Sequence, residues 1–174
     1  MITACKNYLA GKLKSIGVPE ANIRTRIKKS GRYEVPNSAI VLVSDDGWVS
    51  KDTMVSKKMY TDGRGLVLFR QRYKRDLTLE VSLMTTEEAD ADARVTALEA
   101  ALDKSMIVID TALQESIIIK INVEKVLWDD VEAISRSVYT AQVYVKFSRP
   151  IVHAEDQPYF TDVEISKDDL NLES

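Results

Sequence analysis

The chain has 174 residues, of which 45% are hydrophobic and 29% are charged, and its formal net charge at pH 7 is −3. These fractions are typical of globular proteins rather than disordered chains, and the length suffices for a hydrophobic core. No apolar run approaches the roughly 20 residues that a helix needs to cross a bilayer, and the first residues show no export signal, so we expect a cytosolic protein without a membrane partner.

Charge is distributed unevenly along the chain. Residues 1–75 contain sixteen basic and six acidic side chains, whereas residues 76–174 contain eight basic and twenty-one acidic ones. The two halves can pair within one fold, or the basic surface of one subunit can meet the acidic surface of the next in a head-to-tail ring. A nucleic acid is a third partner for the basic half, but the acidic excess opposes it, and we expect no specific nucleic-acid binding.

The first predicted elements are a helix and two strands. Apolar residues recur every three or four positions over residues 2–16, which predicts an amphipathic helix. Basic side chains alternate with other residues from 23 to 28, which predicts a strand with one basic face. The run Ala-Ile-Val-Leu-Val at 39–43 predicts a short buried strand, ending at a turn over residues 44–47.

Residues 44–65 form the least regular stretch and contain three of the chain's six glycines. We expect a loop or a long hairpin here, and a segment of this length in a compact domain is often functional. It can fold onto the core or project toward a partner. The residues expected to contact a partner are Trp48, Lys57, Lys58, Tyr60 and Arg64.

The clearest strand spans residues 66–84. Its odd positions are mostly apolar and its even positions are nearly all polar, so one face packs on a core and the other meets water or a partner. This length is unusual for a strand, so a hairpin turn or a bulge near residues 74–76 is an alternative. The polar face carries Arg70, Arg72 and Lys74.

A second amphipathic helix is predicted over residues 85–103. Thr85 and Glu88 fit a capping box, and acidic residues favour the positive end of the helix dipole. Its apolar stripe comprises Ala91, Val95, Leu98 and Leu102, and its polar face carries Asp90, Asp92 and Glu99.

The last third of the chain is rich in strand-forming residues. Strands are predicted over 106–109, 117–123 and 138–147, the last closed by Pro150, whereas residues 123–137 fit either a helix or a strand. The tail over 155–174 is acidic, and we expect its last residues to be mobile. The whole chain is therefore predicted to be one α+β domain, in which a mainly antiparallel or mixed sheet is packed by the N-terminal helix and the central amphipathic helix.

No catalytic motif fits the few reactive residues of the chain. His153 is the only histidine and Cys5 the only cysteine. A Ser-His-Asp triad or a Cys-His dyad would therefore need His153 as its base. No Gly-x-Ser-x-Gly turn, which would present a nucleophilic serine, is present. One histidine and one cysteine do not make a structural zinc site. The glycine-rich residues 62–65 lack the Gly-Lys-Ser/Thr of a phosphate-binding loop. We therefore expect no enzymatic activity, no cofactor and no metal.

A magnesium-dependent nuclease is the strongest enzymatic alternative. Such a site needs carboxylates that hold the ion and a lysine that stabilises developing charge. Asp76 and Glu80 lie on the polar face of the strand over 66–84, but Ser82 stands where the lysine is needed. Carboxylates at positions 162 and 164 precede a lysine at 167, which misses the alternating register by one residue.

The order of the predicted elements resembles the tail terminator, or tail completion, proteins of tailed bacteriophages and prophages. The N-terminal helix ends in Leu-Lys-Ser-Ile-Gly-Val-Pro at 13–19, and a strand opens at Ile23. The irregular segment, the amphipathic strand Leu66–Met84, the acidic-capped helix Thr85–Asp103 and the strand Val138–Phe147 follow. The resemblance concerns the order and size of these elements over most of the chain, and it includes no diagnostic motif.

This resemblance implies a virion-assembly protein of the host cytoplasm that forms a homo-oligomeric ring, usually a hexamer. Such a ring caps the tail tube, stops its elongation and joins it to the head connector. We expect the ring interface to bring Arg70, Arg72 and Lys74 of one subunit against Asp90, Asp92 and Glu99 of the next. The alternatives are the nuclease and a monomeric adaptor domain.

Overall fold

The computed structural model describes residues 1–26, 37–60, 65–110, 115–133 and 136–157. The chain divides into two compact units. The first comprises Met1–Ser50 and Lys74–Pro150, and the second comprises Lys51–Tyr73 and Ile151–Ser174.

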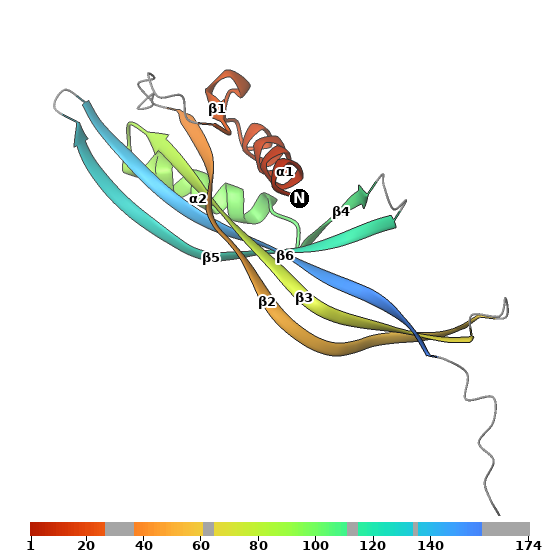
Figure 1. The fold of residues 1–174 in the computed structure, drawn as a ribbon. Helices are drawn as coiled ribbons and strands as arrows, with labels where there is room; N and C mark the ends of the chain where they lie inside the picture. The colour runs from red at the N-terminus through yellow and green to blue at the C-terminus, as the bar shows by residue number, and fades with distance from the viewer. Residues whose placement is uncertain (27–36, 61–64, 111–114, 134–135, 158–174) are drawn as a thin grey trace, which may run out of the picture. The chain divides into compact units, whose positions relative to one another are not determined.

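The described elements are two helices, a short 3-10 turn and six strands (Figure 1). In chain order they are α1 (Ile2–Ser15), η1 (Glu20–Asn22), β1 (Ile23–Arg24), β2 (Ser38–Tyr60), β3 (Gly65–Thr85), α2 (Glu88–Ala101), β4 (Ser105–Asp110), β5 (Glu115–Ala133) and β6 (Arg136–Gln157). The strands form one sheet in the order β1-β2-β3-β6-β5-β4. β1 is parallel to β2, whereas β5 is antiparallel to both β4 and β6. The predicted α+β class, with a mixed sheet, an N-terminal helix and a central helix, is confirmed.

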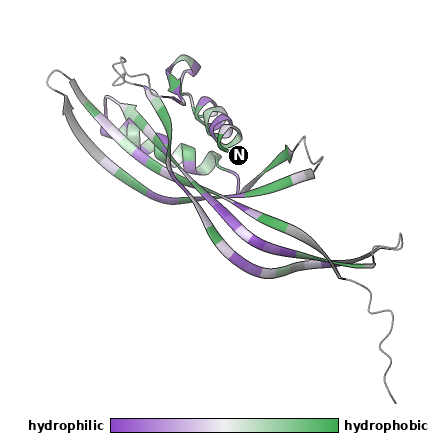
Figure 2. Ribbon diagram, in the orientation of Figure 1, coloured by the Kyte–Doolittle hydropathy of each residue, from purple (hydrophilic) through white to green (hydrophobic). Residues whose placement is uncertain are grey.

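One hydrophobic core joins both helices to the same face of the sheet. The helices contribute Cys5, Leu9 and Leu13 from α1 and Val95 and Leu98 from α2. The sheet contributes alternate residues of four strands: Ala39, Val41, Leu77, Leu79, Val81, Leu83, Ile119, Ile121, Ala141, Val143, Val145 and Phe147. Because successive side chains of a strand point to opposite faces, the residues between these belong to the other face. We call it the outer face, and the alternation appears as changes of hydropathy along β3 and β6 (Figure 2).

The apolar stripe of helix α1 is its buried side. Cys5, Leu9 and Leu13 recur at intervals of four and are fully buried, so one side of the helix packs on the sheet. Gly17 after the helix has a φ of 88°, a left-handed conformation that glycine adopts without steric cost. The predicted helix is confirmed, and so is the long strand β3, which runs from Gly65 to Thr85 as a single strand.

The predicted strand over 39–43 is confirmed as part of β2, but the turn over 44–47 is wrong. The irregular loop over 44–65 is also wrong for residues 44–60 and 65, while residues 61–64 lie outside the described residues. β2 continues through the Ser-Asp-Asp-Gly sequence to Tyr60 and is followed by β3 from Gly65. The cause is a cross-strand pair in which Arg75 of β3 donates to both carboxylate oxygens of Asp46, at 2.8 and 2.6 Å. This pair holds a turn-like residue in an extended strand. The alternative of a long hairpin is therefore the better description.

The segment over 123–137, which fitted either a helix or a strand, is strand over 123–133 and 136–137, and residues 134–135 lie outside the described residues. Two further boundaries differ from prediction. Pro150 does not close β6, which continues to Gln157. The pairing of β6 with β5 ends at Ser148, so the missing N–H of Pro150 breaks no hydrogen bond of the ladder on that side. β1 has only two residues.

The predicted capping box at the start of α2 is wrong. The helix begins at Glu88 without a side-chain cap, and Thr85 Oγ1 instead donates to the carbonyl oxygen of Glu87 at 2.8 Å. The predicted stripe is confirmed, with Ala91, Val95 and Leu98 buried. Neither described helix is long and apolar enough to cross a membrane. The acidic tail from residue 158 onward lies outside the described residues.

Replacing Phe147 tests whether this core holds the fold. Its side chain is fully buried and packs edge-on against Tyr8 of α1, with ring centroids 6.1 Å apart. Phe147→Ala leaves a cavity between α1 and β6, so the free energy of unfolding should fall by about 3–5 kcal/mol in urea denaturation. Val43→Ala, at a side chain 42% exposed on β2, is the control and should change it by less than about 1 kcal/mol. Equal effects of the two would contradict this placement of the core.

Candidate functional site

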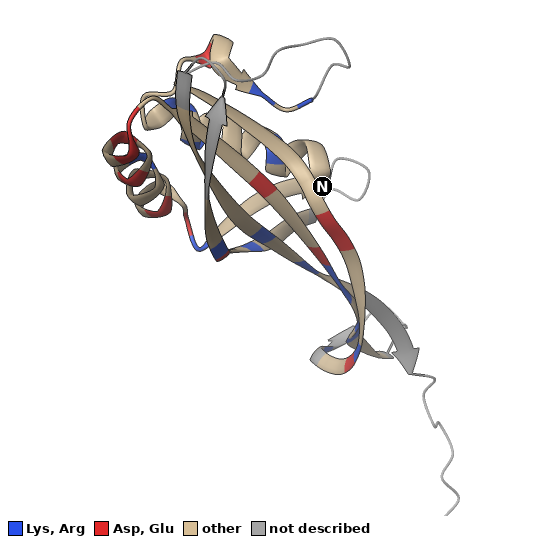
Figure 3. Cartoon of the chain, turned by 90° about the vertical axis from the view of Figure 1, so that its left-hand side faces the viewer, with Lys and Arg blue, Asp and Glu red and all other residues tan. Residues whose placement is uncertain are grey.

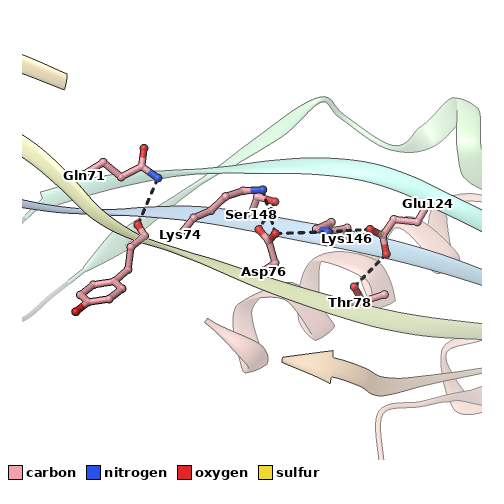
Figure 4. A network of polar contacts seen from close by, with 8 residues as sticks. Gln71, Lys74, Asp76, Thr78, Glu124, Lys146 and Ser148 are labelled. Atoms are coloured by element: carbon pink, nitrogen blue, oxygen red, sulfur yellow. Dashed lines mark hydrogen bonds and ion pairs between the residues drawn. The ribbon is translucent and has the colours of Figure 1, made fainter. Parts of the chain in front are cut away.

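The outer face of the sheet carries a network of charged and polar contacts centred on Asp76 of β3 (Figure 4). Asp76 Oδ2 lies 3.0 Å from Lys74 Nζ and 3.4 Å from Lys146 Nζ of β6. Ser148 Oγ donates to the other carboxylate oxygen of Asp76 at 2.7 Å. Lys146 Nζ also lies 2.9 Å from Glu124 Oε1, so the network links β3, β6 and β5.

The surroundings of Asp76 and Lys146 shift their pKa values toward the charged forms. Burial raises the pKa of Asp76, but the hydrogen bond from Ser148 and the nearby ammonium groups of Lys74 and Lys146 outweigh it, so this pKa lies below its usual value. The hydrogen bond to Glu124 raises the pKa of Lys146. Carboxylates and ammonium groups therefore neutralise one another across the three strands.

The polar contacts of these carboxylates bear on the nuclease hypothesis. Glu80 accepts hydrogen bonds from Ser82 Oγ at 3.0 Å and from Tyr144 Oη at 3.3 Å, while Asp76 contacts two lysines. In the described part of the chain, no three His, Cys, Asp or Glu side chains are grouped so that they could hold a metal ion. The second carboxylate pair, at 162 and 164, lies outside that part. The nuclease hypothesis therefore stays a prediction.

The exposed surface of helix α2 is acidic, and we call it the acidic face of α2; its acidic residues are red in Figure 3. Its members, on and just before the helix, are Glu87, Glu88, Asp90, Asp92 and Glu99, and all five are exposed. Within the described residues, none of them forms an ion pair. The first of them complement the helix dipole, but the helix contains only one basic residue, Arg94. The predicted interface residues Asp90, Asp92 and Glu99 are thus all exposed on α2. At about 3.6 residues per turn, Asp90 lies on the opposite side of the helix from Glu99, so the three residues flank the buried stripe on both sides.

A hollow of about 480 Å³ adjoins this acidic face, lined by Glu88, Ala89 and Asp92 of α2 and by Trp128 of β5. The indole of Trp128 is 49% exposed. Two carboxylates beside an aromatic ring favour a cationic side chain. The sequence did not indicate Trp128 as part of this surface, because its segment fitted a helix and a strand equally well and its facing was therefore undetermined.

The predicted basic interface residues have contacts within their own chain. Arg70 Nη1 and Arg72 Nη1 of β3 lie 3.3 and 3.6 Å from the same oxygen of Asp52 in β2. Lys74 belongs to the network around Asp76. The role of these three residues between subunits stays a prediction.

The residues expected to form a partner-contact loop belong to strands where the structure describes them. Trp48 is 58% exposed in β2, and the Arg75 guanidinium lies 5.4 Å from its ring centroid. Lys57 is exposed in the same strand. The side chains of Lys58 and Tyr60, and all of Arg64, lie outside the described residues, so their partner contacts stay a prediction.

The reactive residues weighed as nucleophile or base are the remaining sequence candidates. Cys5 belongs to α1 and faces the core, and burial raises the pKa of its thiol to about 11. A thiol in this setting is a packing residue, because thiolate is the reactive form. His153 lies in β6, and its side chain is outside the described residues.

Sequence reasoning missed an apolar surface on β4 and β5. Ile107 and Ile109 of β4 are each 68% exposed, and Ile118 of β5, which pairs with Ile107, is 56% exposed. The signal was the apolar run at 106–109, but a run without polar alternation does not show which residues face outward.

Searches against protein-family models and curated proteins find no match to this chain. The proposals below therefore rest on the sequence and on the geometry of the described residues.

Asp76→Asn tests the network on the outer face. The change leaves two lysines without their shared counter-charge, so the free energy of unfolding should fall by about 1–3 kcal/mol at pH 7. Because the pKa of Asp76 is depressed in the fold, its contribution is present above the unfolded-state pKa of about 3.9 and is lost as the pH falls through the folded-state pKa.

The difference between wild type and Asp76→Asn should therefore shrink as the pH is lowered from about 4. The control is Asp45→Asn at an exposed position, which should change stability by less than about 0.5 kcal/mol. A difference that is constant from pH 7 to pH 2 would contradict the assigned ion pairs.

Proposed function

We propose that the protein is a virion-assembly subunit of the tail terminator kind. It forms a homo-oligomeric ring in the host cytoplasm, with six copies as the expected number. The ring caps the tail tube of a phage or prophage particle, stops its elongation and joins it to the head connector.

The acidic face of α2 is the observation that carries this proposal. Five exposed carboxylates on and just before one short helix, without an ion-pair partner in the described part of the chain, repel one another unless a basic surface covers them. The first 75 residues of every copy carry a basic excess. A neighbouring subunit can therefore supply the complementary charge. Two unlike patches make a heterologous interface, which gives a ring when the rotation between neighbouring subunits closes.

The basic side of this interface is expected on β3, at Arg70, Arg72 and Lys74. Their contacts with Asp52 and Asp76 fix the side chains in place. A guanidinium has five N–H donors, so one arginine can contact carboxylates of more than one residue. The hollow beside Trp128 is a suitable place for such a cationic side chain.

Termination by such a ring would be steric. A ring bound to the last ring of the tail tube occupies the surface on which the next tube ring would assemble, and its opposite side stays available to the connector. Steric termination needs no catalytic side chain. It is therefore compatible with the network around Asp76, in which the carboxylates contact lysines of the same chain.

Charge reversal on α2 tests the ring. The double variant Asp90→Lys/Glu99→Lys removes the charge complementarity between neighbouring subunits. The mass found by light scattering should fall from that of a ring to that of a dimer or a monomer of the 19.6 kDa chain. Glu20→Lys/Asp45→Lys is the control, because it changes net charge equally at exposed positions away from α2. Ring mass retained by the α2 variant, or lost equally in the control, would contradict the proposal.

The genes that flank the coding sequence test the role of the ring. Phage tail genes are expected to be clustered, so the neighbours should encode tail tube and head-connector proteins. Tube subunits from that cluster, polymerised with the protein present, should give tubes of limited length in electron micrographs. Unchanged tube growth with a ring of correct mass would reject termination while leaving the ring intact.

A further inference from the structure

Strand β4 lies at one edge of the sheet, next to β5, and no described segment pairs with its other side. Its centre, Met106–Ile109, contains neither charge nor proline, the two features that commonly keep an edge strand from pairing with another chain. Figure 2 shows β4 as largely hydrophobic. Both of its faces are apolar, since Met106 and Val108 pack against the core while Ile107 and Ile109 are exposed.

The main-chain groups at this edge have a defined pattern. Ile121 N donates to Lys104 O at 2.9 Å, so these two residues form a hydrogen-bonded pair of the β4–β5 ladder. Such pairs alternate along antiparallel strands, so positions 106 and 108 also bond to β5. The N–H and C=O groups of Ser105, Ile107 and Ile109 consequently point away from β5 toward the open edge.

We propose that β4 pairs antiparallel with β4 of a second copy, with Ile107 opposite Ile107, so that two sheets become one. In this register Ser105 lies opposite Ile109 of the second copy. The outward N–H and C=O groups of both strands then face each other in hydrogen-bonded pairs. A two-fold axis through the Ile107 pair relates the two copies, as in most homodimers.

This register extends two apolar rows across the junction. On the outer face the existing pair Ile118–Ile107 meets the same pair of the second copy, so four isoleucines form a continuous row. On the helix side Met106 lies opposite Val108 of the second copy. Cross-strand pairs of this kind stabilise antiparallel sheets, and the pairing covers the most exposed large apolar side chains of the unit.

The charges at the ends of β4 identify a second copy as the occupant. The strand is preceded by Lys104, which forms no ion pair in the described part of the chain, and it ends at Asp110. Antiparallel pairing about Ile107 places Lys104 opposite Asp110 of the second copy. Asp110 pairs in register with Glu115 of β5, so this end of the hairpin carries two acidic residues. Two-fold symmetry produces this complementarity twice.

A shift of the register loses the match. If Val108 lay opposite Val108, Met106 would lie opposite Asp110, which puts a carboxylate beside a thioether. The sequence from 104 to 110 is therefore self-complementary in one register, with a cation at one end, an anion at the other and apolar residues between.

This inference is independent of the proposed function, because it uses β4 and not the acidic face of α2. When both interfaces form, a ring held through α2 pairs with a second ring, and the assembly contains an even number of chains. When only the β4 interface forms, the protein is a dimer of twice 19.6 kDa.

Charge exchange between positions 104 and 110 tests the pairing, with mass measured by light scattering over a range of concentrations. Lys104→Glu and Asp110→Lys each put like charges opposite each other and should halve the mass of the assembly. The double variant restores opposite charges and should restore the wild-type mass. The two positions are about 20 Å apart along one strand, so no contact within one chain produces this rescue.

A second pair of variants separates pairing from folding. Ile107→Lys places two lysines opposite each other and should halve the mass, whereas Leu127→Lys, at a side chain 43% exposed on β5, should leave it unchanged. Circular dichroism should show both variants folded. A monomeric wild type, equal masses of the single and double charge variants, or the same loss of mass in Leu127→Lys would overturn the inference.

The two proposals fail in different ways. If charge reversal on α2 leaves the mass unchanged while Lys104→Glu halves it, the ring is rejected and the β4 pairing stands. If Lys104→Glu leaves the mass unchanged while charge reversal on α2 reduces it, the β4 pairing is rejected and the ring stands.

Discussion

The burial of one face of the sheet under both helices is the constraint on which the rest of this structure depends. α1 and α2 pack on the same side, so the alternate residues of β2, β3, β5 and β6 on that side form one core. Burial of apolar surface is the main favourable contribution to folding. Once that face is fixed, the period of two along each strand decides which residues lie on the outer face.

The outer face, which the helices do not cover, carries charged residues in its central part and exposed apolar residues on β4 and β5. Asp76, Lys146 and Glu124 compensate one another across three strands, and this attraction offsets part of the desolvation cost of placing charges on a half-buried surface. Beyond the network, the exposed isoleucines of β4 and β5 have no such compensation within the described chain. The same holds for the carboxylates on α2. These two surfaces are where a further protein surface would lower the free energy most.

The sequence predicted elements with a clear period and missed those whose local signals conflict with tertiary contacts. The stripe of Leu9 and Leu13 and the alternation of β3 located the core elements correctly, because burial on one face leaves a regular pattern. The Ser-Asp-Asp-Gly turn in β2 and the stop at Pro150 were wrong, because Arg75 holds Asp46 in an extended strand and because pairing with β5 has already ended at Ser148.

The candidate surfaces were predictable to different degrees. Asp90, Asp92 and Glu99 were found from helical spacing, since charges on the outside of an amphipathic helix remain exposed. The internal partners of Arg70, Arg72 and Lys74 were not, because ion pairs between strands depend on a register that the sequence does not give. The open edge at β4 was invisible for the same reason, since only the strand order reveals which strand is last.

Amide hydrogen exchange along β4 tests most directly whether this protein works by docking onto copies of itself. At concentrations where it is assembled, the amides of Ser105, Ile107 and Ile109 should be protected like those of Met106 and Val108. On dilution or in Lys104→Glu, only the first three should lose protection. Rapid exchange of these three amides at every concentration, with Met106 and Val108 still protected, would contradict the account.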